Sequence, residues 1–261
     1  MDRPPLDAAR LRERLAARWG RVEVVDETDS TNADLLADRA AGDRSLLVAE
    51  HQSAGRGRFD RRWSSPPRAG LTFSVLLRPS VPLVRWGWLP LLTGLALHEA
   101  VTEHTGVATS LKWPNDLLAH PSGGKLAGIL AQSSGEAVVV GVGLNVDTTA
   151  DELPVETATS LALCGAGPLD RTALLAAIAG RIDARVAQWS DCDGDAAACG
   201  LAAAYRAACS TIGRPVRVSL TGAEELRGQA VDVDDVGRLV LRTGSGEQVV
   251  GAGDVEHLRP A

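Results

Sequence analysis

The chain has 261 residues, 45% of them hydrophobic, which is enough to bury a core in one large domain or in one domain with a small appendage. Its 33 acidic residues outnumber the 27 basic ones, and the net charge of −6 argues against a surface that binds a long phosphate backbone throughout. No signal peptide and no membrane-spanning run is visible, and the four cysteines form no C-x-x-C pair, so we predict a reduced, cytoplasmic protein without a membrane partner.

The first expected elements are a helix, a strand and a short second helix. Apolar spacing predicts a helix over residues 7–19 and a strand over 22–25. A short helix is expected after Ser30-Thr31-Asn32, since Ser30 or Thr31 makes a good N-cap. The alternative is that these hydroxyl and amide groups hold the polar head-group of a ligand at the helix N-terminus.

Strands are then expected at 46–49 and 71–77, and the segment between them is rich in arginine. It contains Gly55-Arg56-Gly57-Arg58-Phe59-Asp60-Arg61-Arg62-Trp63, with four arginines in nine residues. One interpretation is a solvated basic loop, and the other is a loop that wraps a polyanion such as a triphosphate or a nucleic-acid backbone. A long loop in a compact domain is uncommon unless it is a functional lid or is disordered.

The middle of the chain is predicted to contain both helices and strands. A long apolar helix is expected in the core, and the strand that follows it ends in the turn tripeptide Pro114-Asn115-Asp116. Gly141 and Gly143 in a later strand suggest that another group approaches the backbone closely. The predicted elements are a helix at 85–105, a strand at 110–113, a hairpin of strands at 125–131 and 137–146, a loop at 151–168, and helices at about 170–190 and 195–209.

From Gly213 onwards the pattern changes to short alternating strands at 216–218, 228–233, 239–241 and 248–250. Closely spaced strands of this kind fit a small SH3-like barrel. We therefore divide the chain into a larger domain of residues 1–212 and a C-terminal domain of residues 213–261. The C-terminal domain has six arginines against eight acidic residues, so it offers no basic track for nucleic acid.

Lysine and asparagine are rare in this chain. Of the 27 basic residues only Lys112 and Lys125 are lysines, and Asn32, Asn115 and Asn145 are the only asparagines. Because arginine is used so freely elsewhere, we infer that a lysine marks a place that needs a compact, rotatable ammonium group.

The standard phosphate-binding motifs are missing. Gly123-Gly124-Lys125 lacks the earlier glycine of a P-loop, and Gly141-x-Gly143 lies in a strand without the third glycine of a dinucleotide-binding turn. What remains is a cationic loop with a tryptophan, two lysines at strand ends and an asparagine beside glycines. This set predicts a site for a triphosphate and a carboxylate, where catalysis proceeds by charge stabilisation and alignment rather than through a covalent enzyme intermediate.

Six motifs stand out along the chain: Ser30-Thr31-Asn32, Gln52, Gly55-Arg56-Gly57-Arg58, Lys112-Trp113-Pro114-Asn115-Asp116, Gly124-Lys125-Leu126-Ala127-Gly128-Ile129-Leu130 and Gly141-Val142-Gly143-Leu144-Asn145-Val146. Both lysines and all three asparagines lie inside them. In their order and approximate spacing, these motifs resemble those of the biotin protein ligases. The resemblance implies an α+β fold, in which a mixed β-sheet flanked by helices forms a class II synthetase-like catalytic domain and a small SH3-like β-barrel follows.

The resemblance implies a ligase that works in two steps. The carboxylate of biotin attacks the α-phosphate of ATP, with Mg²⁺, to give biotinyl-5′-AMP and pyrophosphate. A lysine of a biotin carboxyl carrier domain, from an acetyl-CoA or acyl-CoA carboxylase, then attacks the mixed anhydride and releases AMP. Biotin and ATP are therefore the expected small substrates.

The resemblance also implies roles for individual residues. Lys125 is expected to stabilise charge on the carboxylate and α-phosphate oxygens, and Arg56 and Arg58 complete the expected catalytic set. Trp63 and Asn145 are expected to bind adenine, and no metal ligands are assigned. The expected biotin site comprises Ser30, Thr31, Asn32, Gln52, Arg56, Gly57, Arg58, Lys125 and Gly128, and the expected nucleotide site comprises Arg58, Trp63, Lys112, Asp116 and Asn145.

The chain departs from the family pattern in two places. Asp60 stands where the family usually has glycine. Only 29 residues precede Ser30, too few for a winged helix-turn-helix, so we expect a ligase that does not bind operator DNA.

Arg61 and Arg62 are expected to be solvated or to lie outside direct contact with the ligand. Residues 55–68 are expected to be poorly ordered until biotin or its adenylate binds, because an acyl-adenylate must be shielded from water.

Two alternative functions stay open at the level of the sequence. A lipoate or octanoate protein ligase would share the general architecture. A non-catalytic module that binds biotin or single-stranded nucleic acid would also use a cationic loop with interleaved aromatic residues. Biotin-dependent ATP–pyrophosphate exchange distinguishes the first alternative, and transfer of biotin to a carrier domain distinguishes the second.

Overall fold

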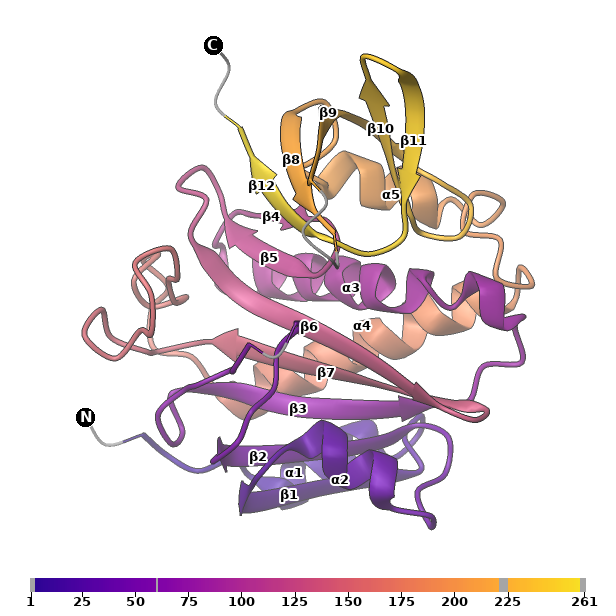
Figure 1. The fold of residues 1–261 in the computed structure, drawn as a ribbon. Helices are drawn as coiled ribbons and strands as arrows, with labels where there is room; N and C mark the ends of the chain where they lie inside the picture. The colour runs from indigo at the N-terminus through magenta and orange to yellow at the C-terminus, as the bar shows by residue number, and fades with distance from the viewer. Residues whose placement is uncertain (1–2, 60, 221–224, 259–261) are drawn as a thin grey trace.

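Among the residues that the structure describes (3–59, 61–220 and 225–258), seven strands form one mixed sheet (Figure 1). This is a computed structural model, and it confirms the predicted mixed sheet flanked by helices. Only β1 and β2 run parallel, and every other neighbouring pair is antiparallel. In sheet order the strands are β1 (Arg21–Thr28), β2 (Ser45–Gln52), β3 (Gly70–Leu77), β7 (Ala137–Asn145), β6 (Lys125–Ser134), β5 (Asp116–Ala119) and β4 (Thr109–Lys112).

Within the same described ranges there are five α-helices, and three of them begin at a side-chain cap. Asp7, Ser30 and Asp170 each accept a hydrogen bond from the backbone N–H three residues ahead, which satisfies one free donor of the first turn. None of these five helices combines the length and apolar character that a membrane crossing requires. The helices are α1 (Ala8–Leu15), α2 (Thr31–Ala37), α3 (Trp88–Thr105), α4 (Arg171–Ser190) and α5 (Leu201–Ala208), with a 3₁₀ turn, η1 (Leu83–Arg85), before α3.

One predicted helix is wrong in its first part. The helix expected at 195–209 begins only at Leu201, because Asp193, Gly194 and Gly200 adopt positive φ and turn the chain between α4 and α5. In addition, β5 has no counterpart among the predicted strands. Four residues directly after a turn give too short an alternating pattern to stand out.

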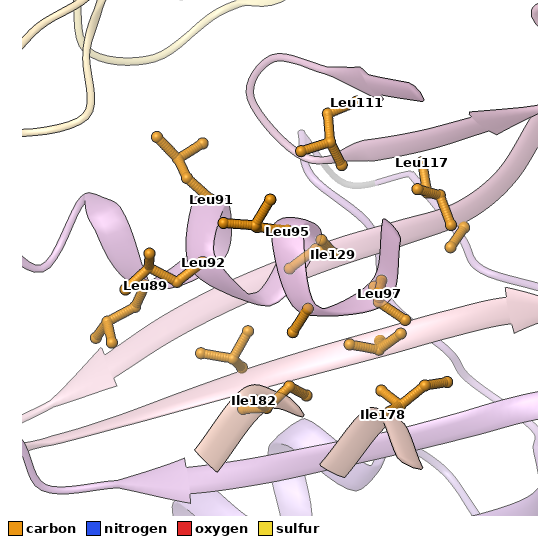
Figure 2. Close-up of a cluster of buried hydrophobic side chains, with 14 of the residues drawn as sticks. Leu89, Leu91, Leu92, Leu95, Leu97, Leu111, Leu117, Ile129, Ile178 and Ile182 are labelled. Atoms are coloured by element: carbon orange, nitrogen blue, oxygen red, sulfur yellow. The ribbon is translucent and has the colours of Figure 1, made fainter. Parts of the chain in front are cut away.

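The helices α3 and α4 cover one face of the large sheet and bury the main core against it (Figure 1). In β7, Val140 and Val142 belong to this core, whereas Gly141 and Gly143 point to the opposite face because side chains alternate along a strand. That opposite face carries the expected site residues. Figure 2 shows the core side chains of α3, the sheet and α4 that meet in one cluster, among them Leu89, Leu91, Leu92, Leu95, Leu97, Leu111, Leu117, Ile129, Ile178 and Ile182.

A second sheet of five antiparallel strands follows in the C-terminal part (Figure 1). In the described residues β11 and β12 are its two edges and no pairing joins them, so the predicted closure into an SH3-like barrel is not confirmed. What the structure shows is an antiparallel sheet whose last strand, β12, was not predicted. In sheet order the strands are β11 (Gly246–Val250), β10 (Leu239–Thr243), β9 (Glu225–Val233), β8 (Pro215–Ser219) and β12 (Asp254–His257).

The turn between β9 and β10 joins the two sheets. The indole Nε1 of Trp88 donates to the carbonyl oxygen of Asp235 (2.9 Å), and the indole Nε1 of Trp113 donates to that of Gly237 (3.1 Å). Both indoles are fully buried. The C-terminal sheet is therefore held against the start of α3 and the end of β4, next to the face that carries the expected site.

A buried ion pair holds the N-terminal segment on the large sheet. Arg171 Nη1 lies 2.7 Å from Glu50 Oε2, and the two side chains are only 6% and 4% exposed. The same guanidinium donates to the carbonyl oxygens of Gly70 (3.0 Å) and Pro4 (2.6 Å), while Glu50 Oε1 accepts the N–H of Leu6 (2.5 Å). Both buried charges are thus satisfied by hydrogen bonds as well as by each other.

Candidate active site

One row of opposed residues crosses the large sheet and forms the floor of the site. The strand registers place Lys112 opposite Asp116, which in turn lies opposite Gly128. Gly128 lies opposite Gly143, and Gly143 lies opposite Thr72. Directly opposed residues point to the same face of a sheet. Because the two central positions are glycines, the middle of the row is open, and polar side chains stand on either side of it.

The indole of Trp63 covers this open floor. A Cβ on Gly143 would lie 2.1 Å from Cε2 of Trp63, and a Cβ on Gly128 would lie 3.3 Å from its Cζ3. A side chain at Gly143 would therefore collide with the indole. The Nε1–H of Trp63 is buried and has no hydrogen-bond partner among the described residues, which leaves a donor for a ligand or a water molecule.

The arginine segment between β2 and β3 folds into a short hairpin that brings Trp63 to this floor. The N–H of Gly57 donates to the carbonyl oxygen of Arg61 (2.6 Å), and that of Trp63 donates to the carbonyl oxygen of Gly55 (3.0 Å). In Figure 1 the segment crosses the sheet on the face opposite α3 and α4. Asp60 lies outside the described residues.

Arg58 reaches from the hairpin to the C-terminal sheet. Its Nη1 donates to the carbonyl oxygen of Gly253 (3.2 Å) and lies 3.4 Å from Oδ1 of Asn115. Its guanidinium also lies 4.9 Å from the centre of the Phe59 ring. Burial lowers the pKa of Arg58 from its ordinary value, although two nearby carboxylates oppose this shift. The side chain remains a charged donor that is removed from bulk water.

Arg61 forms an ion pair with Asp254 of β12, a contact that the sequence did not predict. Burial alone would raise the pKa of Asp254, but the hydrogen bond from Arg61 and the nearby positive charges hold it below its ordinary value. Arg61 and Arg62 are both exposed, as predicted, yet both line the cavity under the hairpin.

Hydroxyl and amide groups form a connected network at one end of the cavity. Gln52 Oε1 accepts the N–H of Thr31 (2.7 Å) and lies 3.0 Å from Thr31 Oγ1. Ser74 Oγ lies 2.6 Å from that hydroxyl and donates to Asn32 Oδ1 (2.6 Å). Asn32 Nδ2 donates to Gln132 Oε1 (2.9 Å). These bonds fix the orientation of the Asn32 and Gln52 amides, which line the cavity.

Sequence reasoning found part of this network and missed part of it. Ser30 caps α2, which confirms the structural interpretation, and it also lines the cavity, so the ligand-binding interpretation stays a prediction. Ser74 and Gln132 were missed. The available signal was the period of two: Ser74 follows Thr72 on one face of β3, and Gln132 lies on the same face of β6 as Gly128.

Lys125 pairs with Asp116 across the end of β6. Lys125 Nζ lies 2.6 Å from Asp116 Oδ1. Alternation alone would place Lys125 on the face opposite Gly128, three residues later. The register between β5 and β6 shifts between Leu117 and Leu118, and this bulge turns Lys125 to the face of the site.

Two cavities meet at this ion pair. The first lies under the hairpin, and the second lies between the large sheet and the C-terminal sheet. Trp63, Asp116 and Lys125 line both. The free volume of the first is only about 120 Å³, because Trp63 occupies its floor. The first cavity brings together the whole expected biotin set, Ser30, Thr31, Asn32, Gln52, Arg56, Gly57, Arg58, Lys125 and Gly128.

The expected nucleotide residues divide between the cavities. Arg58 lies in the first, whereas Lys112 and Asn145 lie in the second. Asn145 is 3% exposed, and its Nδ2 donates to the carbonyl oxygen of Thr159 (3.0 Å). One of its two amide protons is thus bound to the backbone, which orients the side chain at the cavity wall.

Comparison with known proteins identifies the same two regions. Residues 22–148 match the biotin/lipoate A/B protein ligase family, and residues 211–258 match the biotin protein ligase C-terminal domain. The chain is 46% identical to a protein of Mycobacterium tuberculosis named biotin--[acetyl-CoA-carboxylase] ligase, over 98% of this chain and 97% of that protein. It is 31% identical to the bifunctional ligase/repressor BirA of Bacillus spizizenii, over 90% of this chain and 72% of that protein.

Solved structures lead to the same family. The biotin protein ligase of Aquifex aeolicus in complex with biotin and ATP superimposes with a TM-score of 0.78 at 28% identity, over 93% of this chain and all of that one. The sequence match, the two-sheet fold and the row of residues at the meeting point of two cavities agree. The chain belongs to the biotin protein ligase family.

Proposed function

We propose that this chain is an ATP-dependent, AMP-forming ligase that joins biotin to a lysine of a biotin carboxyl carrier domain. The observation that carries the proposal is the meeting of two cavities at Lys125 and Asp116. One cavity ends in a network of hydroxyl and amide groups that suits the ureido ring of biotin. The other is bordered by Lys112 and Asn145 and suits a nucleotide. The relatives named as ligases, and the Aquifex structure with biotin and ATP, support this assignment.

In the first step, a carboxylate oxygen of biotin attacks the α-phosphorus of ATP and pyrophosphate leaves. Negative charge on the carboxylate and on the α-phosphate oxygens must be brought together and stabilised. Lys125 stands where the two cavities join, and its ion pair with Asp116 orients the ammonium group. Arg56 and Arg58 line the first cavity and supply further positive charge from the hairpin. The chain accelerates the reaction by alignment and electrostatics.

In the second step, the amine of the carrier lysine attacks the acyl carbon of biotinyl-5′-AMP. An amide bond forms, the acyl–oxygen bond breaks, and AMP leaves with the phosphate oxygen. The lysine must approach the anhydride from a side that biotin does not fill. The second cavity, which also reaches Lys125 and Asp116, offers that approach.

Mg²⁺ is part of the proposal, and the chain fits it. Mg²⁺ is usually held by one or two carboxylates together with substrate phosphates and water. Asp116 lines both cavities, so its carboxylate is the group that would hold the ion beside the phosphates. The bound ion would supply neutralisation of phosphate charge.

Exchange of labelled pyrophosphate into ATP tests the first step. We expect exchange that depends on biotin and does not occur with lipoate or octanoate, followed by transfer of biotin to the carrier domain of an acetyl-CoA carboxylase. Pyrophosphate exchange that depends on lipoate instead of biotin would show that the chain is a lipoate protein ligase. Tight binding of biotin without exchange would establish a non-catalytic module.

The proposal also assigns the parts of the chain. Catalysis resides in residues 1–212, and residues 213–261 form an SH3-like C-terminal domain; the separate family match at 211–258 supports this boundary. The enzyme acts in the cytoplasm on its carrier and does not bind operator DNA. Sequence-specific binding of the chain to promoter DNA at physiological salt would contradict the last point.

A further inference from the structure

The strand β12 is a free edge of the C-terminal sheet. In the described residues β12 pairs only with β8. The N–H of Leu258 donates to the carbonyl oxygen of Pro215 (2.9 Å), which makes these two opposed residues a hydrogen-bonded pair of the antiparallel ladder. Hydrogen-bonded and non-hydrogen-bonded pairs alternate. The N–H and C=O groups of Val255 and His257 therefore point away from β8.

This edge borders the second cavity. All four residues of β12 line that cavity, together with Lys112, Asp116 and Lys125. Its volume is about 1400 Å³, which exceeds the roughly 300–1,000 Å³ of most small-molecule sites. A bound nucleotide would therefore fill only part of this cavity. The remaining space lies along β12 and is continuous with the proposed reaction centre.

The opposite edge of the same sheet has different surroundings. β11 lines neither cavity. The two-residue turn between β10 and β11 makes Thr243 and Gly246 a hydrogen-bonded pair, so the N–H groups of Glu247 and Val249 point outward. Val249 is 48% exposed. The two edges thus carry outward backbone groups in the same pattern, but only β12 faces the reaction centre, and there Val255 is 3% exposed and His257 is half-buried.

We propose that the free edge of β12 binds an extended segment of the carrier domain, which adds to the C-terminal sheet beside the lysine to be modified. This inference rests on the proposed function. Backbone pairing of an added strand supplies affinity while it demands little of the partner's sequence. It also fixes the register of the bound segment, and hence the distance from the attacking lysine to Lys125 and Asp116.

Amide hydrogen exchange of the whole chain, resolved by NMR, tests the contact directly. The probe is the biotin-free carrier domain of an acetyl-CoA carboxylase, added without ATP so that no reaction occurs. We expect exchange at Val255 and His257 to slow by about tenfold or more at saturating carrier. Exchange at Glu247 and Val249 should not change. Equal protection at both edges, or none at β12, would overturn the proposal.

A proline substitution tests the same contact by kinetics. A proline at an edge position removes an outward N–H without breaking the ladder. His257→Pro is compared with His257→Ala, so that loss of the imidazole is common to both variants, and Val249→Pro with Val249→Ala serves as the matched pair on β11. We expect the KM for the carrier domain to be about three- to tenfold higher in His257→Pro than in His257→Ala. The KM for the carrier domain should be the same in Val249→Pro and Val249→Ala.

The outcomes separate this inference from the proposed function. Biotin-dependent pyrophosphate exchange should be the same in His257→Pro and His257→Ala. If the unaltered chain transfers biotin but both kinetic pairs behave alike and β12 is not protected, the docking proposal is wrong. If the unaltered chain shows neither biotin-dependent pyrophosphate exchange nor transfer of biotin to the carrier domain, the proposed function is wrong. If His257→Pro does not fold, the amide hydrogen exchange of the unaltered chain with the carrier domain decides the question.

Discussion

Lys125 differs from the many arginines around it in the geometry of its charge. Its ammonium group is a compact donor on a flexible stem, and it lies 2.6 Å from Asp116 at the junction of two cavities. A guanidinium is larger, planar and fixed in its donor directions, so it cannot point at two developing charges from the same place. Lys112, the other lysine of the chain, stands in the same cross-sheet row.

We predict that Lys125→Arg keeps the positive charge but loses about 100-fold or more in the rate of biotin-dependent pyrophosphate exchange, as expected when a preorganised charge-stabilising donor is misplaced. Steady-state exchange kinetics and a thermal unfolding curve measure the effect. The control is Arg227→Lys, at an arginine whose side chain is 66% exposed and lies in neither cavity. Exchange at the unaltered rate in Lys125→Arg would show that no compact ammonium is needed.

The glycines of the floor lead to a second residue-scale prediction. Gly143→Ala places a Cβ 2.1 Å from the Trp63 ring and must displace it, so we expect exchange to fall about tenfold or more. Gly180→Ala, on α4 with no atom within 4 Å of the added Cβ, should leave exchange unchanged and raise the unfolding free energy by about 0.5–1 kcal/mol. Equal kinetics in the two variants would mean that the indole does not rest on the floor during catalysis.

Among the elements, the arginine hairpin has the largest functional consequence. The volume beneath it is about 120 Å³, well below the roughly 300–1,000 Å³ of most ligand sites. Biotin can therefore enter only if Trp63 or the hairpin moves. Arg58 and Arg61 attach the hairpin to other parts of the described chain: Arg58 contacts the carbonyl oxygen of Gly253 and the side chain of Asn115, and Arg61 pairs with Asp254. We therefore predict that the hairpin acts as a lid, with Arg58 and Arg61 attaching it to the C-terminal part of the chain.

Limited digestion with trypsin measures how accessible the arginine hairpin is to cleavage. We predict that cleavage after the arginines of residues 55–68 slows when biotin and ATP are added, because the ligands fill the cavity and hold the hairpin closed. Arg61→Ala removes one outer attachment and should speed cleavage at the remaining sites of the ligand-free chain. Cleavage after the exposed Arg227 is the internal control. Equal digestion of the ligand-free and ligand-bound chains would contradict the lid.

The elements also show what the sequence can and cannot predict. The strands expected at 71–77 and 137–146 correspond closely to β3 and β7, because each is a long run with a clear period. The short strands β5 and β12 have no such signal. The motif residues of the site were found by type and order, but the face of Lys125 depends on a β-bulge. The contact of Arg61 with Asp254 depends on how two sheets dock, which no local pattern records.

At the scale of the whole molecule, one buried ion pair connects segments that are distant in the sequence. Through Arg171 and Glu50 it ties the N-terminal segment, the end of β2, the start of β3 and the start of α4. Gly70, one of its partners, is the residue at which the chain leaves the lid and enters β3. The stability of the fold and the position of the lid's base therefore depend on the same contact.

We predict that Glu50→Gln lowers the free energy of unfolding by about 3–5 kcal/mol, because it leaves the guanidinium of Arg171 buried without its counter-charge. Urea denaturation at neutral pH measures the change. The control is Glu225→Gln, which breaks exposed pairs of the C-terminal sheet and should cost no more than about 1 kcal/mol. Similar losses in the two variants would mean that water reaches the Glu50–Arg171 pair.

The position of Trp63 makes it an intrinsic fluorescence probe of the first cavity. Of the six tryptophans, all within the described ranges, Trp63 alone lines the first cavity, while Trp88, Trp113 and Trp189 are fully buried in the core. Biotin that displaces the indole must change its intrinsic fluorescence while the buried indoles stay constant. Stopped-flow emission should then follow lid movement in real time without an added label, and Trp63→Phe should abolish the signal. An unchanged signal in that variant would place the reporting indole elsewhere.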